Sequence, residues 1–483
     1  MFSFLICLAL LIGGYFLYGK VVENTFGPDD RETPAVKIND GVDYVVLPQW
    51  KLFMIQLLNI AGLGPIFGAL QGALWGPIVF LWITFGTIFA GGVHDYFSGM
   101  MSERNNGASI SEISGIYLGG FMKNVMRVFS VVLLIMVGTV FAVGPAGLIV
   151  TLFKNGGSNG IVTTTLFWLI IVLVYYFIAT FLSIDKIIGK IYPIFGVALI
   201  LMALALLGVL LFGPYRIPEL TTLANAQLDP HSVPIVPTLF ITIACGAISG
   251  VHATQSPLMA RCMRNERESR SVFYGAMISE SIIALVWAAI AMAFWGDVAG
   301  LNGAIAEYGG QAAVMIDVIA NKTLGPALAV FVIFGVVACA ITSGDTAFRS
   351  ARLIVADFMG VEQRTLRKRI YICIPLFALG LLIIFGLPFQ TMWSYFAWMN
   401  QTLAAVTLWM IVAYLRHRGR AVWVGLIPAL VMTYVCASYI FVSPLMLGMQ
   451  NRTAAYLLGG GVTFAVLVAM IFKLKDNDAK GIS

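Results

Sequence analysis

The stretch Asn59-Ile60-Ala61-Gly62-Leu63-Gly64-Pro65-Ile66-Phe67-Gly68 interrupts an apolar segment that otherwise has the character of a transmembrane helix. Its proline removes one backbone donor, and the neighbouring glycines weaken the helix further. In hydrocarbon, a carbonyl that loses its partner must find another, so a broken helix persists only where protein encloses a cavity beside it. We therefore expect a helix break here, next to a binding site.

A second stretch of the same kind is Ile243-Ala244-Cys245-Gly246-Ala247-Ile248-Ser249-Gly250. Two interrupted spans at corresponding positions of two halves point to the binding site of a secondary transporter. The alternative is that these glycines only allow neighbouring helices to pack closely. Because each break opens a block of predicted spans, as described below, we favour the binding site.

The composition places nearly the whole chain in lipid. Of its 483 residues, 60% are hydrophobic and only 11% are charged, and the mean hydropathy is +0.92, whereas soluble domains carry roughly 25% charged residues. The net charge of +6 is better explained by membrane topology than by nucleic-acid binding, because of where the charges lie. The six cysteines show no CxxC spacing, so we expect neither a disulfide framework nor a zinc site.

We predict an all-α integral membrane protein with about thirteen transmembrane helices. The first lacks a basic leading region and a small-residue cleavage site, so we expect a retained helix rather than a signal peptide. The predicted spans cover approximately residues 2–18, 50–72, 75–100, 123–152, 162–182, 188–213, 237–259, 271–296, 324–348, 369–387, 391–415, 421–443 and 454–474.

The basic residues support this count. With the N-terminus outside, one set of loops holds 25 of the 29 lysines and arginines, and the other set holds only Lys154, Arg216, Lys322 and Arg452. Cytoplasmic loops carry the excess of Lys and Arg. The distribution therefore predicts a multi-pass membrane protein with its N-terminus outside and its C-terminus in the cytosol.

The spans divide into two blocks of five, residues 50–213 and 237–415, and each block opens with its broken helix. An odd number of spans makes the second block enter from the opposite side, which predicts the five-plus-five inverted repeat of the LeuT-like fold. One helix, 1–19, precedes the repeats, and two helices within 421–474 follow them. Between the first helix and the first repeat we expect an irregular cytosolic segment, 20–49.

The candidate substrate site follows from the breaks. An unwound helix exposes carbonyls that can hold a cation, and the N-termini of half-helices attract a carboxylate. For the side-chain amides in this set, the alternative is ordinary hydrogen bonding between helices. The predicted substrate-binding residues are Asn59, Ala61, Gly62, Gly64, Cys245, Gly246, Ser249, Gln56 and Gln255.

Ionisable residues inside the membrane are costly and are therefore candidates for proton coupling or gating. Glu280 lies about nine residues, or roughly 14 Å, into its span. His252 follows the second break and can titrate near neutral pH, and Asp95 lies near the cytosolic end of the third span. Asp345 and Arg349 are four residues apart on one helix face, which predicts either an ion pair near the membrane surface or a cytosolic gate.

Several motifs resemble the carbon starvation protein A family, and the resemblance runs from about residue 30 to residue 360. The motifs are Thr33-Pro34-Ala35-Val36, Asn39-Asp40-Gly41-Val42-Asp43-Tyr44, Ile60-Ala61-Gly62-Leu63-Gly64-Pro65, Ala90-Gly91-Gly92-Val93-His94-Asp95 and Leu239-Phe240-Ile241-Thr242-Ile243-Ala244-Cys245-Gly246-Ala247-Ile248-Ser249-Gly250-Val251-His252.

This resemblance implies an inner-membrane secondary transporter of the amino acid–polyamine–organocation superfamily. It also implies short peptides or pyruvate as substrates, usually with proton coupling. The chain has Ile55-Gln56 where family members carry paired histidines. Ala340, Thr342 and Ser343 resemble the pattern with which sodium-coupled members of the superfamily complete a cation site against the first broken helix.

We therefore predict a proton-coupled importer of short peptides or pyruvate that works by alternating access. Its partners are the small-molecule substrate and the lipid bilayer, with no nucleic acid and no cofactor besides the coupling ion. One alternative is a sodium-coupled transporter of another small carboxylate or an amino acid, and another is a channel, although no repeated filter motif is present. We do not expect an enzyme, since the sequence has no HExxH motif and no nucleophile motif in a strand-turn-helix setting.

Overall fold

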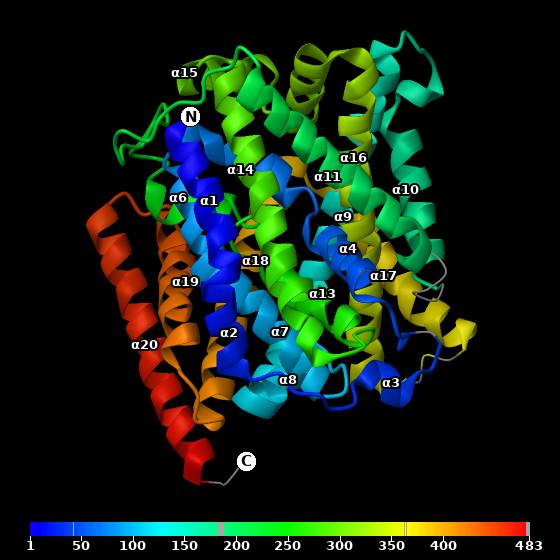
Figure 1. Ribbon diagram of the computed structural model, residues 1–483, viewed down its shortest axis with the longest axis vertical. Coiled ribbons are helices and arrows are strands. Elements are labelled where there is room, and N and C mark those ends of the chain that lie inside the picture. The colour runs from blue at the N-terminus through cyan, green and yellow to red at the C-terminus, as the bar shows by residue number, and fades with distance from the viewer. Residues whose placement is uncertain (42, 182–187, 362, 364, 480–483) are drawn as a thin grey trace.

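The computed structural model describes residues 1–41, 43–181, 188–361, 363 and 365–479, which fold almost entirely into helices (Figure 1). Within that part of the chain, nine helices are long and apolar enough to cross a membrane, or ten if one bent pair forms a single span. The protein is therefore a multi-pass membrane protein. The predicted total of thirteen spans and their inverted-repeat layout stay predictions.

The N-terminal span is longer than we predicted. Helix α1 (Phe2–Phe16) is followed almost without interruption by α2 (Tyr18–Phe26). A short helix, α3 (Pro34–Ile38), follows within the segment that we expected to be irregular. That prediction is wrong for these two stretches, because the helix ends only where Gly27 adopts a left-handed conformation with φ 76°, and because Pro34 favours a helix start.

The first broken helix lies where the sequence predicts it. Helix α4 (Gln49–Ile60) ends before Gly62, and the chain resumes as η1 (Gly64–Gly68) with its axis bent by 56°. The remaining helices of this half are α5 (Ala69–Gly72), η2 (Ala73–Trp75), α6 (Val79–Leu81), η3 (Trp82–Gly91), α7 (Gly92–Arg104), α8 (Ile110–Leu118), α9 (Gly120–Asn155), η4 (Ile161–Thr163), α10 (Thr165–Ala179) and α11 (Ile188–Phe212).

The second break also lies where the sequence predicts it. The entering half consists of η5 (Ile235–Leu239) and α12 (Phe240–Thr242), and the chain resumes as α13 (Gly250–Ala260). The helices that follow are η6 (Glu266–Glu268), η7 (Arg270–Gly275), α14 (Ala276–Phe294), α15 (Val298–Glu307), α16 (Ala312–Met359), α17 (Leu366–Gly386), α18 (Phe389–His417), α19 (Trp423–Val442) and α20 (Arg452–Ala479).

The start of α1 and the last turns of α20 lie at opposite ends of the molecule (Figure 1). We call the end at which α20 finishes the basic end, because ion pairs of basic loop residues gather there. Arg104 pairs with Glu266 at 2.8 Å, Arg267 with Asp30 at 2.6 Å, and Lys123 with Glu112 at 2.5 Å. These basic residues belong to the set of loops for which we predict a cytosolic location.

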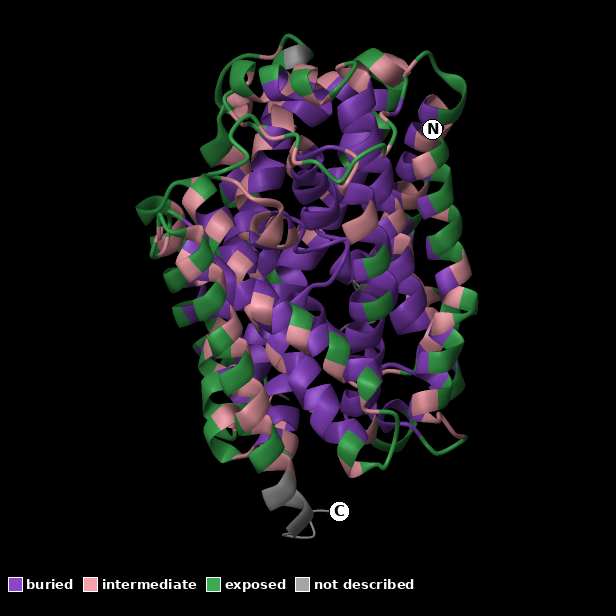
Figure 2. Ribbon diagram, turned by 90° about the vertical axis from the view of Figure 1, so that its left-hand side faces the viewer, coloured by how far each residue is buried: buried purple, intermediate pink, exposed green. Residues whose placement is uncertain are grey.

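Buried residues are concentrated in the central helices, whereas the outward faces of the peripheral helices are exposed (Figure 2). This exposed surface is largely apolar on α1, α10, α11, α17 and α20, which is the surface that a lipid environment covers. All six cysteines are buried and have free thiols.

Candidate functional site

The two helix breaks touch each other at the centre of the molecule. A Cβ atom built on Gly64 would lie 2.2 Å from Cβ of Cys245, so the first break has room for no side chain at this position. Gly246 has φ 89°, a conformation that favours glycine, and a Cβ atom there would lie 3.7 Å from Cα of Pro65. The chain thus brings Gly64, Cys245 and Gly246 of the predicted site together.

Side chains from other helices form hydrogen bonds with the polar groups of the second break. Asn400 on α18 accepts hydrogen bonds at Oδ1 from the backbone N–H of Val251 (2.7 Å) and from Ser249 Oγ (3.1 Å). Thr87 on η3 donates to the carbonyl of Gly246 (3.1 Å), and its hydroxyl lies 2.6 Å from that of Ser281 on α14. Thr87 and Ser281 lie outside the predicted set, because isolated hydroxyl residues are common in apolar spans. An amide in an apolar span is the signal that points to Asn400.

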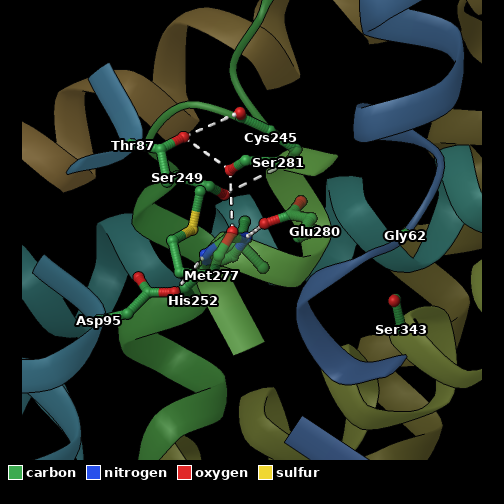
Figure 3. A network of polar contacts seen from close by, with 12 residues as sticks. Gly62, Thr87, Asp95, Cys245, Ser249, His252, Met277, Glu280, Ser281 and Ser343 are labelled. Atoms are coloured by element: carbon green, nitrogen blue, oxygen red, sulfur yellow. Dashed lines mark hydrogen bonds and ion pairs between the residues drawn. The ribbon is translucent and has the colours of Figure 1, made fainter. Parts of the chain in front are cut away.

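An acid–histidine cluster lies beside the second break (Figure 3). Asp95 contacts Nδ1 of His252 through Oδ2 and Nδ1 of His94 through Oδ1, both at 2.8 Å. On the other side of the imidazole, Nε2 of His252 lies 3.6 Å from Oε2 of Glu280. All four side chains have no exposed surface. Asp95 therefore lies next to the second break, deeper than we expected from its position in the sequence.

The cluster is only partly hydrogen-bonded. Within the described residues, Nε2 of His252 and both carboxyl oxygens of Glu280 have no hydrogen-bond partner. A carboxylate on Nδ1 fixes the orientation of an imidazole and leaves Nε2 for the exchange of a proton. The arrangement can therefore hold a proton between His252 and Glu280.

Cys245 completes a group of three metal-ligand types with His252 and Glu280, whose ligand atoms all lie within 4.8 Å of one another. Such a set suits a soft divalent cation. However, the Cys245 thiol donates to Ser249 Oγ at 3.5 Å, which is the role of a protonated thiol. We therefore treat the group as part of the hydrogen-bond network.

At the first break, hydroxyl groups of α16 donate hydrogen bonds to a backbone carbonyl that has lost its helical partner. In a continuous helix the carbonyl of Leu58 would accept from the N–H of Gly62, but this N–H donates to Ile60 instead (2.9 Å). Ser343 (2.9 Å) and Thr342 (3.3 Å) donate to the free Leu58 carbonyl. Two residues of the predicted sodium site thus lie against the first break. The third, Ala340, has its carbonyl 3.4 Å from the hydroxyl of Tyr176.

Two of the predicted amides are available to a ligand and one is not. Gln56 and Asn59 on α4 are at most 1% exposed, and their side-chain nitrogens and oxygens have no partner within the described residues. Gln255 on α13 instead accepts from Ser350 on α16 at 3.4 Å, which is the interhelical bonding that we considered as the alternative. Ala61 caps α4 with its N–H bonded to Leu57.

Asp345 and Arg349 lie apart from the acid–histidine cluster and do not pair with each other. Asp345 accepts from the Tyr175 hydroxyl at 2.9 Å. Arg349 donates to the carbonyl of Ala179 at 2.7 Å and lies 3.9 Å from Oδ1 of Asp43. The predicted ion pair between the two is therefore replaced by contacts with α10 and with the segment before α4.

A cavity of about 400 Å³ leads from the end opposite the basic end toward the first break. The residues that line it include Phe67 of η1 and the glutamines Gln71, Gln311 and Gln390. The ring of Phe67 lies 6.0 Å from that of Trp393 on α18. The aromatic pair therefore lies where this cavity approaches the break.

Comparison with known proteins identifies the family. The sequence profile of the family described as "Carbon starvation protein CstA" matches residues 1–188, 148–321 and 297–438. The chain belongs to this family.

Individual relatives include an uncharacterized membrane protein of Haemophilus influenzae, which is 42% identical over 63% of this chain and 94% of its own length. The peptide transporter CstA of Bacillus subtilis is 26% identical over 90% of this chain and 88% of its own length. The pyruvate/proton symporter BtsT of Escherichia coli is 26% identical over 53% of this chain and 43% of its own length.

Solved structures confirm the fold class. MhsT in complex with L-phenylalanine superposes with a TM-score of 0.57 at 14% identity, covering 88% of this chain and 99% of the other. A manganese transporter of Eremococcus coleocola superposes with a TM-score of 0.51 at 12% identity, covering 91% and 99%. The chain therefore has the all-α, LeuT-like fold that the two breaks predict.

Proposed function

We propose that this chain is a secondary transporter that imports short peptides or pyruvate by alternating access and is coupled to protons. The observation that carries the proposal is the acid–histidine cluster beside the contact of the two broken helices, where Nε2 of His252 lies 3.6 Å from Oε2 of Glu280. The names of relatives such as the peptide transporter CstA and the pyruvate/proton symporter BtsT support the same class.

Proton coupling follows from the charge balance of a buried site. An unpaired carboxylate is expensive in a low-dielectric interior, and a proton between Glu280 and His252 removes that cost. An arriving substrate carboxylate adds a negative charge to the same region. The substrate and the proton then stabilise each other, which is the thermodynamic requirement for symport.

The substrate class follows from the groups left available at the breaks. Asn400 already accepts from the N–H of Val251 at the start of α13, so this helix end acts on a nearby carboxylate through its positive dipole end alone. Both pyruvate and a peptide C-terminus supply a carboxylate. Gln56 and Asn59 offer amide donors and acceptors that have no partner within the described residues. We propose that these groups orient the remainder of the substrate.

Alternating access is supported by the difference between the two ends. The cavity lined by Phe67 approaches the first break from the end opposite the basic end. At the basic end, the segment between α2 and α4 is tied to the rest of the molecule, for example through the pair of Asp30 with Arg267. We propose that the basic end faces the cytosol of a bacterium and that this arrangement is an outward-facing state.

The test is uptake into proteoliposomes that contain the purified full-length chain. An inward proton gradient should drive accumulation of labelled pyruvate or a dipeptide, and Glu280→Gln should remove the dependence on the gradient. Glu307→Gln, at an exposed position on α15, is the matched control and should behave like the wild type. If neither substrate accumulates under a proton or a sodium gradient, the proposal fails.

Sodium coupling is the second candidate, and the hydroxyls of Thr342 and Ser343 against the Leu58 carbonyl favour it. In the same assay, accumulation driven by a sodium gradient at equal pH on both sides would support it. Substrate flux that equilibrates without accumulating under either gradient would instead indicate a channel.

A further inference from the structure

Two arginines of α16 lie side by side near the basic end, below the first break. Arg349 and Arg352 are three residues apart, so they share one helix face. Counted from Ser343, they are roughly 9 and 14 Å further along the helix. Arg349 is 1% exposed and Arg352 is 0% exposed. They therefore lie inside the protein, on the helix that leads from the first break toward the basic end.

Several donors of these guanidinium groups are unused. Arg349 donates to the Ala179 carbonyl at 2.7 Å, and Arg352 donates to Oε1 of Gln363 at 3.0 Å. Nε of both arginines and Nη2 of Arg352 have no hydrogen-bond partner within the described residues. A buried donor without an acceptor is destabilising, and a buried charge more so. The two groups therefore form a site that an anion would stabilise.

Asp43 faces this site from the segment between α3 and α4, but it does not fill it. Its Oδ1 lies 3.9 Å from Arg349 and 3.7 Å from Arg352, which is longer than the 2.7–2.9 Å of a charge-assisted hydrogen bond. Oδ1 itself has no hydrogen-bond partner within the described residues. One carboxylate thus faces two guanidinium groups without bonding either.

The segment that carries Asp43 is docked by a few separate contacts. The hydroxyl of Tyr44 donates to the carbonyl of Asn106, just after α7, at 2.8 Å. The backbone N–H of Leu47 donates to the carbonyl of Cys262, just after α13, at 3.1 Å. Release of these contacts would withdraw Asp43 and leave both guanidinium groups facing the space it occupied.

We propose that Arg349 and Arg352 form a second binding site, on the cytosolic side, for the carboxylate of the transported substrate, and that Asp43 occupies it as a stand-in between transport cycles. The proposal rests on the proposed function for the identity of the substrate. Its ligand class is a monocarboxylate, either a small 2-oxo acid or a peptide C-terminus. The carboxylate is the class that matches the group already facing the site, and a planar guanidinium binds it through two parallel hydrogen bonds.

The proposal predicts opposite effects for the two partners. Asp43→Asn removes the competing carboxylate, so the substrate should bind more tightly. Arg352→Gln removes one of the two receiving groups, so it should bind more weakly. A purely structural ion pair would instead make the two substitutions act in the same direction.

The experiment measures binding by the purified full-length protein in detergent, using calorimetric titration with pyruvate and with dialanine as probes. Asp43→Asn should lower the dissociation constant of at least one probe roughly tenfold, and Arg352→Gln should raise it roughly tenfold. Arg352→Lys should restore part of the loss. The matched control is Glu32→Gln, which removes an exposed carboxylate from the same segment and should leave the constant unchanged.

Three results would overturn the proposal: equal effects of Asp43→Asn and Glu32→Gln, wild-type affinity in Arg352→Gln, or binding of neither probe by Asp43→Asn. Because binding is measured without a gradient, the outcome is separate from that of the uptake assay. Opposite shifts in binding together with gradient-independent uptake would reject proton coupling and keep the second site. Proton-driven uptake without these shifts in binding would keep proton coupling and reject the second site.

Discussion

Charged groups at the centre of the molecule and at its basic end are paired in different ways. At the basic end, Arg104 binds both carboxyl oxygens of Glu266 at 2.9 and 2.8 Å and also donates to the carbonyl of Gly27. At the centre, both carboxyl oxygens of Glu280 lack a hydrogen-bond partner within the described residues. Both glutamates have no exposed surface, so burial alone does not distinguish them.

The difference teaches where to look for function. A saturated ion pair such as Arg104–Glu266 fastens the end of α7 to the loop after α13. Hydrogen bonds from Arg31 likewise hold the pKa of Asp29 well below its usual range. An incompletely bonded group retains free energy that a proton or a substrate can recover by binding. We therefore expect substitutions of incompletely bonded groups such as Glu280 to change transport, and substitutions in saturated pairs such as Arg104–Glu266 to change mainly stability.

We expect the largest effect on transport from a substitution that adds atoms where the two helix breaks touch. Gly64→Ala places a methyl group 2.2 Å from Cβ of Cys245, and both backbones are constrained there. We expect uptake into proteoliposomes to fall by at least 100-fold. Gly208→Ala on α11, where a new Cβ meets nothing within 4 Å, is the control. Cys245→Gly should restore part of the activity, and failure of this pair to interact would contradict a direct contact.

Asp95→Asn comes next and tests the comparison directly. It weakens a charge-assisted hydrogen bond to His252. Such a bond contributes about 1.5–3 kcal/mol, so we expect the rate of proton-driven uptake to fall roughly 10- to 100-fold. Glu266→Gln at the basic end should instead lower the melting temperature of the purified protein while uptake per folded molecule changes less than twofold. If Asp95→Asn changed mainly stability and Glu266→Gln mainly uptake, the distinction between incompletely bonded groups and saturated ion pairs would be wrong.

Ser343→Ala should have a smaller effect. The substitution removes one of the two hydroxyls that satisfy the free Leu58 carbonyl, and Thr342 remains in place to donate to it. A hydrogen bond of this kind contributes about 1 kcal/mol, so we expect a decrease in uptake of roughly fivefold, with proton dependence retained. Loss of a sodium dependence in this variant would indicate that the first break holds the coupling ion.

Glu112→Gln on the short helix α8 should have the smallest effect. Partial burial raises the pKa of Glu112, but hydrogen bonds from Lys123 and Arg127 outweigh it and leave this pKa below the usual range. The ion pairs therefore contribute stability above a pH of about 4.3, the unfolded value, and lose it as the pH falls through the lower folded value. The melting temperatures of variant and wild type should differ at pH 7 and converge on acidification.

The local features of this protein could be predicted from its sequence, and the distant contacts could not. Gly62, Gly64 and Pro65 interrupt a helix wherever it folds, so the first break needed no tertiary information. Glu280 and His252 were recognisable because ionisable groups are rare in lipid-embedded segments. The meeting of Asp95 with His252 joins residues 157 positions apart, and without homologous sequences no pattern in a single chain reports such a distance.

The errors have similar causes. The segment 20–49 was expected to be irregular because it contains Gly27-Pro28 and Pro48. These residues end or exclude a helix only locally, so α2 continues until Gly27 provides a left-handed end. Arg349 was paired with Asp345 because the two share a helix face, whereas the fold places the carboxylate of Asp43 opposite Arg349. Neighbours along a helix identify possible partners, and packing decides which of them are used.

The contact between Gly64 and Cys245 also has a consequence for the evolution of the family. Two positions 2.2 Å apart, measured from a hypothetical Cβ, cannot change independently, because a side chain gained at one requires atoms lost at the other. Lineages that acquire a larger residue at position 64 should therefore carry glycine at position 245. An alignment of many relatives should show these two sites covarying, with the change at position 245 preceding the change at position 64.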